Sequence, residues 1–118
     1  MSKYGPTVNP GDTRVRLWRM QIENPLTALP YMKFHENEVI QNSDGDEKEL
    51  DRTRDIDLPY DPDTAAGKMI QIRNPEDDSD SDLFGETEIS LEDVYKVLYS
   101  LGRYAQEEQD IKDNPTTA

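Results

Sequence analysis

Alternating carboxylates between residues 78 and 82 form the pattern in this sequence that most resembles a metal site. Calcium loops of the EF-hand type space their oxygen ligands in this way, but they also need a glycine at the sixth position and a glutamate at the twelfth. Leu83 and Ile89 occupy those two positions. We therefore interpret residues 76–88 as a solvated acidic loop and predict no metal ligands, with a weak, irregular divalent-cation site as the alternative.

Two further candidates for chemistry have the wrong residue types. The segment Ala65–Lys68 resembles the end of a phosphate-binding loop, which needs another glycine five positions before its last glycine and a serine or threonine after the lysine. Pro62 and Met69 stand at those positions. His35 is the only histidine, and a lone histidine on a strand is usually structural. Since the chain also lacks cysteine, we predict that it is not an enzyme and has no catalytic residues, no cofactor and no small-molecule substrate.

The composition lies close to that of disordered proteins. Hydrophobic residues make up 33% of the 118 residues and charged residues another 33%, with a net charge of −13. Soluble domains average roughly 45–50% apolar and about 25% charged residues. Such a chain is long enough for one domain, but it has difficulty burying enough apolar surface to offset the entropy lost on folding. We expect its fold to depend on partner subunits.

Negative charge is concentrated in the second part of the chain. Residues 1–41 carry a net charge of +1, whereas residues 42–118 carry −14. Strong acidity argues against nucleic acid or an anionic membrane as the partner. No apolar run approaches the ~20 residues of a membrane helix, and the N-terminus lacks the apolar core of a signal peptide. We expect a soluble protein made in the cytosol, with protein partners.

Strands are predicted in the first two thirds of the chain, after an extended N-terminal arm formed by the proline- and glycine-containing residues 1–13. The alternation of apolar residues slips between Leu17 and Trp18, which indicates a bulge or a strand with apolar contacts on both faces. Composition and turn signals, including Asp44-Gly45, give four strand candidates: residues 14–22, 31–41, 52–58 and 68–73. We expect a β-rich unit over residues 14–75, a small and mainly antiparallel sheet, followed by the acidic loop at 76–89.

The clearest element is a helix that begins after Ser90. Ser90 is a suitable N-cap, and Asp93 stands where a capping box places an acid. Asn114-Pro115 limits extension at the other end. We predict a helical unit over residues 90–111, with the helix ending near Asp110 and a tail at 112–118, so that the single domain has α+β architecture.

Apolar residues cover more of this helix than contact with one small sheet requires. One stripe contains Leu91, and a second contains Val97, Leu101 and Tyr104. The surplus predicts a second contact, with a copy of the same chain or with another protein. The alternative is that the tyrosines of the second stripe are simply half exposed. The predicted interface residues are Tyr95, Val97, Leu98, Tyr99, Leu101 and Tyr104.

Four segments together resemble small structural proteins encoded among the tail genes of tailed bacteriophages. They are the lead-in Asn9–Asp12, the strand Arg14–Ile22, the segment Leu58–Pro62 and the helical Val94–Leu101. The resemblance implies a virion component, assembled in the host cytoplasm, that contacts other virion proteins and copies of itself. It implies no catalytic motif and no small-molecule site.

The leading hypothesis is therefore a non-enzymatic structural or adaptor protein of a tailed-phage particle, in the tail, baseplate or fibre region. One alternative is an acidic inhibitor that imitates DNA and binds a basic enzyme in a salt-sensitive complex. Another is a free regulatory or chaperone-like protein that is partly disordered alone.

Overall fold

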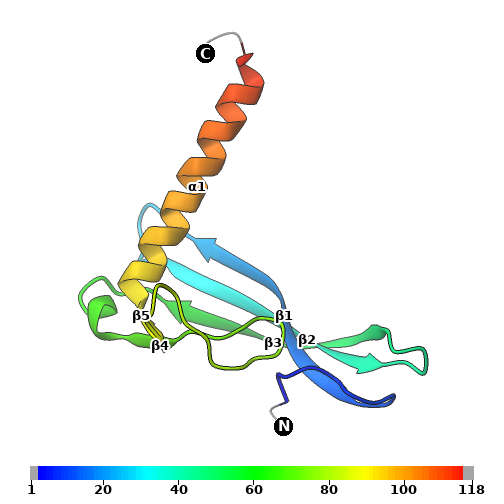
Figure 1. Cartoon of the computed structure of the whole chain (residues 1–118). Coiled ribbons are helices and arrows are strands. Elements are labelled where there is room, and N and C mark those ends of the chain that lie inside the picture. Colours follow the sequence, from blue (N-terminus) through cyan, green and yellow to red (C-terminus); the bar gives the residue numbers. More distant parts are fainter. Residues whose placement is uncertain (1–2, 116–118) are drawn as a thin grey trace.

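This computed structural model describes residues 3–115 of the chain, which form two antiparallel β-sheets and one long helix (Figure 1). The larger sheet has the strand order β1-β2-β3, and the smaller sheet pairs β4 with β5. The elements are β1 (Thr13–Glu23), β2 (Tyr31–Gln41), β3 (Glu47–Pro59), the short 3₁₀ helix η1 (Ala65–Gly67), β4 (Met69–Gln71), β5 (Glu88–Ser90) and α1 (Leu91–Asp113). The predicted α+β class, antiparallel sheet followed by one C-terminal helix, is confirmed.

The larger sheet is a meander with an irregularity where the sequence predicts one. β1 pairs antiparallel with β2, and the register shifts between Leu17 and Arg19. An extra residue in β1 moves the later apolar side chains to the other parity, which explains the slip in the sequence pattern. The predicted turn between β2 and β3 also forms, with Gly45 at φ 91°, a conformation that glycine adopts without the clash of a Cβ.

Two parts of the sheet structure differ from the prediction. β3 begins at Glu47 rather than near Arg52, because its charged first half pairs with β2. Arg14 stabilises this extension by donating to both carboxylate oxygens of Glu47, at 2.7 and 2.6 Å. β4 lies within the strand predicted at residues 68–73, but it does not join the larger sheet; it pairs with β5, which overlaps the end of the segment predicted as acidic loop. β5 was not predicted, because its three residues are too few for alternation to reveal a strand.

The N-terminal arm is tied to the larger sheet by backbone hydrogen bonds. Val15 N–H donates to the carbonyl of Lys3 at 2.8 Å, and Gly11 N–H donates to the carbonyl of Gln41 at 2.9 Å. The predicted arm is therefore held against β1 and β2 near both ends of its described part. Its residues 1–2, and residues 116–118 of the predicted tail, lie outside the described residues.

The hydrophobic core is small and lies where the first turns of α1 meet η1 and one end of the larger sheet. Its buried members are Met32, Tyr60, Ala65 and Leu91. Partly buried neighbours complete the cluster, namely Phe34, Leu58, Val94, Tyr95 and Leu98. These contacts join the C-terminal helix to the sheets and set the direction in which it leaves them.

The chain is more extended than a globular domain of its length. Its radius of gyration is 18.1 Å, whereas about 13.5 Å is typical for this chain length. Its accessible surface is 8915 Å², against about 6,600 Å² for a monomer of this mass. Figure 1 shows α1 projecting from the sheets, and its main contacts are with η1 and β5 near its start. Every residue from Tyr99 to Pro115 is exposed.

Candidate interaction surface on helix α1

Helix α1 begins at the predicted cap. The Ser90 hydroxyl accepts a hydrogen bond from the backbone N–H of Asp93 at 3.1 Å, which satisfies one of the free N–H groups at a helix start. Leu91 N–H donates to the carbonyl of Lys68 at 2.9 Å, and the Leu91 side chain is almost fully buried, with 2% of the residue exposed. The start of the helix is therefore fixed by both polar and apolar contacts.

Tyr95 and Leu98, two of the predicted interface residues, contact the chain's own core. The ring of Tyr95 stacks on that of Tyr60, with centroids 4.3 Å apart and planes at 21°. Leu98 packs against the same buried cluster. These two residues position the helix, so they differ in role from the other predicted residues.

The remaining predicted residues are exposed. Val97, Tyr99, Leu101 and Tyr104 each keep 58–60% of their surface accessible. Ile111, which is 62% exposed, was not predicted, although it lies seven residues after Tyr104 and continues the spacing. We call Val97, Leu101, Tyr104 and Ile111 the apolar stripe.

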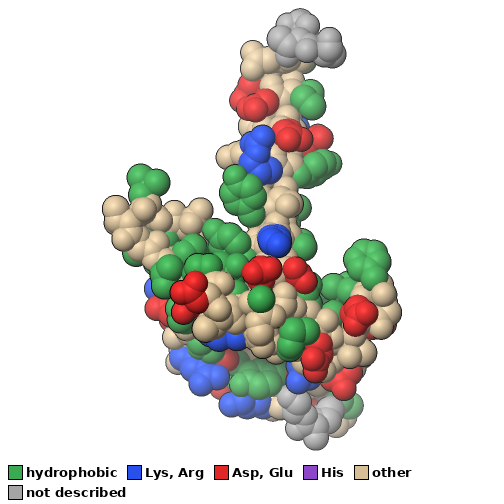
Figure 2. All heavy atoms as spheres, turned by 90° about the vertical axis from the view of Figure 1, so that its left-hand side faces the viewer, with side chains coloured by type: hydrophobic (Ala, Val, Ile, Leu, Met, Phe, Trp, Pro, Cys, Tyr) green, Lys and Arg blue, Asp and Glu red, His purple; other side chains and the backbone are tan. Residues whose placement is uncertain are grey.

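The apolar stripe occupies one side of α1. With 3.6 residues per turn, its members fall within a sector of about 80°, whereas Tyr99 lies roughly 160° from its centre. The ion pairs Lys96–Glu92 (3.4 Å) and Arg103–Glu107 (3.6 Å) join side chains on a third face. Figure 2 shows hydrophobic side chains along α1 and on the protrusions that flank its base. The stripe is therefore distinct from both the anchoring side and the paired charges.

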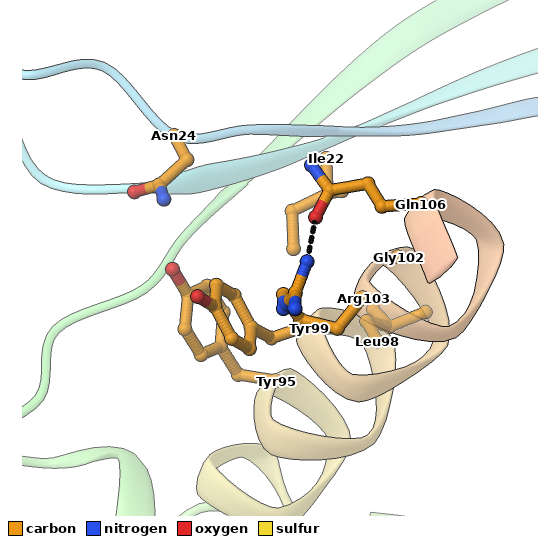
Figure 3. A pocket seen from close by; sticks show the side chains of 8 residues that line it. All are labelled: Ile22, Asn24, Tyr95, Leu98, Tyr99, Gly102, Arg103 and Gln106. Atoms are coloured by element: carbon orange, nitrogen blue, oxygen red, sulfur yellow. Dashed lines mark hydrogen bonds between the residues drawn. The ribbon is translucent and has the colours of Figure 1, made fainter. Parts of the chain in front are cut away.

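A shallow groove separates α1 from the end of β1 (Figure 3). Its volume is about 240 Å³, below the roughly 300–1,000 Å³ of typical small-molecule sites. Residues on both sides line it, including Ile22 and Asn24 from the hairpin and Tyr95, Tyr99, Gly102 and Gln106 from the helix. Because the groove is small and open, it does not enclose a ligand, and it lies on the side of α1 opposite the apolar stripe.

His35, the only histidine, is held in a polar cluster on the larger sheet. Its Nδ1 lies 2.7 Å from a carboxylate oxygen of Asp55, and its Nε2 lies 2.9 Å from the side-chain oxygen of Gln21. Arg52 approaches both Nδ1 and Asp55, at 2.9 and 3.2 Å, and its guanidinium also lies over the ring of Trp18. The hydrogen bond from His35 lowers the pKa of Asp55 below its ordinary value. These contacts join all three strands of the sheet.

Glu36 is a buried carboxylate beside this cluster. It is 4% exposed, accepts from Arg54 Nε at 2.6 Å and from Arg54 Nη2 at 3.3 Å, and also accepts from the hydroxyl of Thr53 at 3.0 Å. Hydrogen bonding from Arg54 lowers the pKa of Glu36, against the opposing effect of burial. The fold therefore favours the ionised carboxylate of Glu36, and the ion pair between Glu36 and Arg54 links β2 to β3.

A hollow of about 370 Å³ lies near the bulges of the larger sheet and is lined by residues that include Trp18, Asn37 and Leu50. The side-chain oxygen of Asn37 is buried without a hydrogen-bond partner among the described residues. That oxygen is closed off from the hollow's surface, so a ligand in the hollow would not reach it in this conformation.

Carboxylates of the acidic loop stabilise local turns. Asp77 accepts from the backbone N–H and the hydroxyl of Ser79, at 3.0 and 2.6 Å, and these bonds lower the pKa of Asp77. Arg73 lies 3.7 Å from Asp80. Within residues 3–115, no cluster of three or more metal-ligating side chains is found.

Among the described residues, no helix is long and apolar enough to cross a membrane. Comparison with family models, with curated proteins and with solved structures gives no match for this chain.

Proposed function

We propose that this chain is a non-enzymatic structural or adaptor subunit that binds other proteins through the apolar stripe of α1. The observation that carries the proposal is the exposed outer part of the helix, where Val97, Leu101, Tyr104 and Ile111 are 59–62% accessible. Large apolar side chains that gather on one exposed face are typical of binding surfaces.

The physics of an isolated helix supports this role. Residues 99–113 are exposed and receive little support from the rest of the described chain. Helices in proteins owe most of their stability to tertiary packing, which this outer part largely lacks, and Gly102 weakens it by about 1 kcal/mol relative to alanine. A partner that covers the stripe would stabilise the helix and bury its apolar surface in one step.

The resemblance to phage tail proteins supports a place in a virion, in the tail, baseplate or fibre region. The resembling segments form the lead-in to β1, most of β1, the end of β3 with the core residue Tyr60 that follows it, and the first turns of α1. Two of the four, Leu58–Pro62 and Val94–Leu101, contribute residues to the core where the helix joins the sheets. A subunit of this kind would act passively, by holding neighbouring proteins in a defined arrangement.

The test is incorporation into particles. In a host infected with the corresponding phage, the double substitution Leu101→Asp and Tyr104→Asp should remove the protein from purified particles, as measured by quantitative mass spectrometry. Tyr99→Asp is the matched control, because Tyr99 is equally exposed but lies on the opposite side of α1. Leu98 is unsuitable for this test because it packs against the core.

Two results would contradict the proposal. Absence of the wild-type chain from purified particles would refute the virion assignment. Retention of the double variant at wild-type stoichiometry would refute the role of the stripe.

A further inference from the structure

Apolar residues of α1 follow a heptad pattern that starts at Val94, which is partly buried against the core, and continues along the exposed apolar stripe. Val94, Val97, Leu101, Tyr104 and Ile111 occupy positions a, d, a, d and d of successive heptads. Only the a position at Glu108, between Tyr104 and Ile111, is polar. This spacing places the side chains along one face of the helix, which is the arrangement that packs into the face of a second helix.

The apolar stripe is sterically open to a second helix. The side of α1 that faces the groove and the hairpin is centred roughly 160° from the stripe. Ile22 and Asn24 line the groove on that other side. A helix lying along the stripe would therefore leave the hairpins of both molecules on the outside of the pair.

We propose that α1 packs antiparallel against α1 of a second copy of this chain. The a and d positions from Val94 to Ile111 are spaced symmetrically about a point between residues 102 and 103, so two antiparallel helices can align them. In this register Leu101 lies opposite Tyr104 of the second copy, Val94 opposite Ile111, and Val97 opposite Glu108. Each apolar residue then meets an apolar group or the methylenes of Glu108.

Glu108 decides the orientation. In a parallel pair, identical a positions face each other, so two carboxylates would be placed together in the interface, at a cost in stability. In the antiparallel pair Glu108 lies over Val97 of the second copy, and its carboxylate can extend to water as long charged side chains do at interfaces. Avoiding contact between two Glu108 carboxylates therefore favours the antiparallel arrangement.

The chain as a whole exposes more surface than a monomer of its mass normally does. The chain exposes 8915 Å², about 2,300 Å² more than a typical monomer of its mass. A standard protein interface takes about 800 Å² from each partner. This inference deepens the proposed function, since it names the first partner of the stripe as another copy of the same chain.

Sedimentation equilibrium of the purified full-length chain tests self-association. The wild type should be dimeric at micromolar concentration, and Leu101→Asp should raise the dimer dissociation constant at least a hundredfold. Tyr99→Asp should leave it within about threefold, and far-ultraviolet circular dichroism of the strands controls for folding. A wild-type monomer at several hundred micromolar would overturn the proposal, and so would equal effects of the two substitutions.

Disulfide cross-linking tests the orientation, because the chain has no cysteine of its own. Val97 and Glu108 are both exposed and lie about 17 Å apart along one helix, so cysteines at both positions cannot join within one molecule. The double variant Val97→Cys, Glu108→Cys should give a covalent dimer on oxidation, whereas Glu108→Cys alone should not. Efficient cross-linking of the single variant would indicate a parallel pair and overturn the antiparallel register.

The two proposals fail separately. If the isolated chain is monomeric but Leu101→Asp, Tyr104→Asp still prevents incorporation into particles, the stripe binds a different virion protein and only the dimer is refuted. If the chain dimerises through the stripe but is absent from particles, the dimer stands and the virion role is refuted.

Discussion

Gly102 offers a direct test of the conclusion that the outer part of α1 is unsupported. A Cβ added at this position meets no atom within 4 Å among the described residues, and the backbone is helical. Gly102→Ala should therefore stabilise the helix by about 0.5–1 kcal/mol, through the backbone entropy that glycine loses on folding. Amide exchange over residues 103–113 should slow by roughly two- to fivefold.

Gly45 provides the matched control with the opposite sign. A Cβ there also meets nothing within 4 Å in the described part of the chain, but φ is +91°. Alanine in the left-handed region costs about 1–2 kcal/mol, partly offset by about 0.4–1 kcal/mol from the stiffer unfolded chain. Gly45→Ala should therefore lower the free energy of unfolding by about 1 kcal/mol.

Both substitutions should be measured in the same two experiments, urea unfolding of the sheet and hydrogen exchange resolved by residue. Gly102→Ala should protect only the outer helix and leave the unfolding midpoint of the sheet unchanged in the Leu101→Asp background, where dimers are suppressed. Gly45→Ala should lower that midpoint. A loss of helix protection in Gly102→Ala would show that this glycine lies against a neighbour, and the view of an open helix would be wrong.

Three further predictions concern the base of the molecule. Leu91→Ala should lower the free energy of unfolding by about 2–5 kcal/mol in urea titrations, because Leu91 is fully buried where the helix joins the sheets. The control Leu101→Ala should change the free energy of unfolding of the monomer by less than about 0.5 kcal/mol. Because the fold lowers the pKa of Glu36, the Glu36 carboxylate contributes its full stabilisation above the ordinary carboxyl pKa of 4.5 and loses it as the pH falls below that value. Glu36→Gln should therefore reduce the loss of stability between pH 5 and pH 3. An unchanged pH profile would contradict the importance of the Glu36–Arg54 pair. Phe84 has φ 53° and is fully exposed at a hairpin tip, so Phe84→Asn should raise the free energy of unfolding by about 1 kcal/mol, and a destabilised variant would indicate that Phe84 packs against something.

Much of the fold could be predicted because its signals are local. β2 has the predicted bounds, and Ser90 caps α1 as expected, since strand composition and cap chemistry act within a few residues. The bulge at Leu17 was also detectable in the sequence, because one inserted residue exchanges the two faces of a strand and shifts the alternation of apolar residues. These features need no knowledge of distant parts of the chain.

What could not be predicted depends on contacts between distant segments. The run of charges at Glu47–Asp51 has the composition of a loop, and it becomes strand because β2 pairs with it and Arg14 binds Glu47. The pairing of β4 with β5 joins residues on either side of the acidic loop. Likewise, periodicity placed Tyr95 on the same stripe as Leu91, but it could not identify Tyr60 as the ring on which Tyr95 stacks.

The low apolar content of the sequence and the extended shape have one physical origin. A chain with few apolar residues can form only a small core, and this one also leaves the apolar stripe of α1 exposed. Its free energy of unfolding should therefore be low when it is alone and should rise on binding, by RT ln(1 + [L]/Kd) for a partner that binds only the folded state. If that partner is a second copy, the melting temperature should increase with protein concentration in the wild type and stay constant in Leu101→Asp. A concentration-independent melting temperature in both would mean that the small core alone sets the stability, and that the stripe contributes nothing until a different protein covers it.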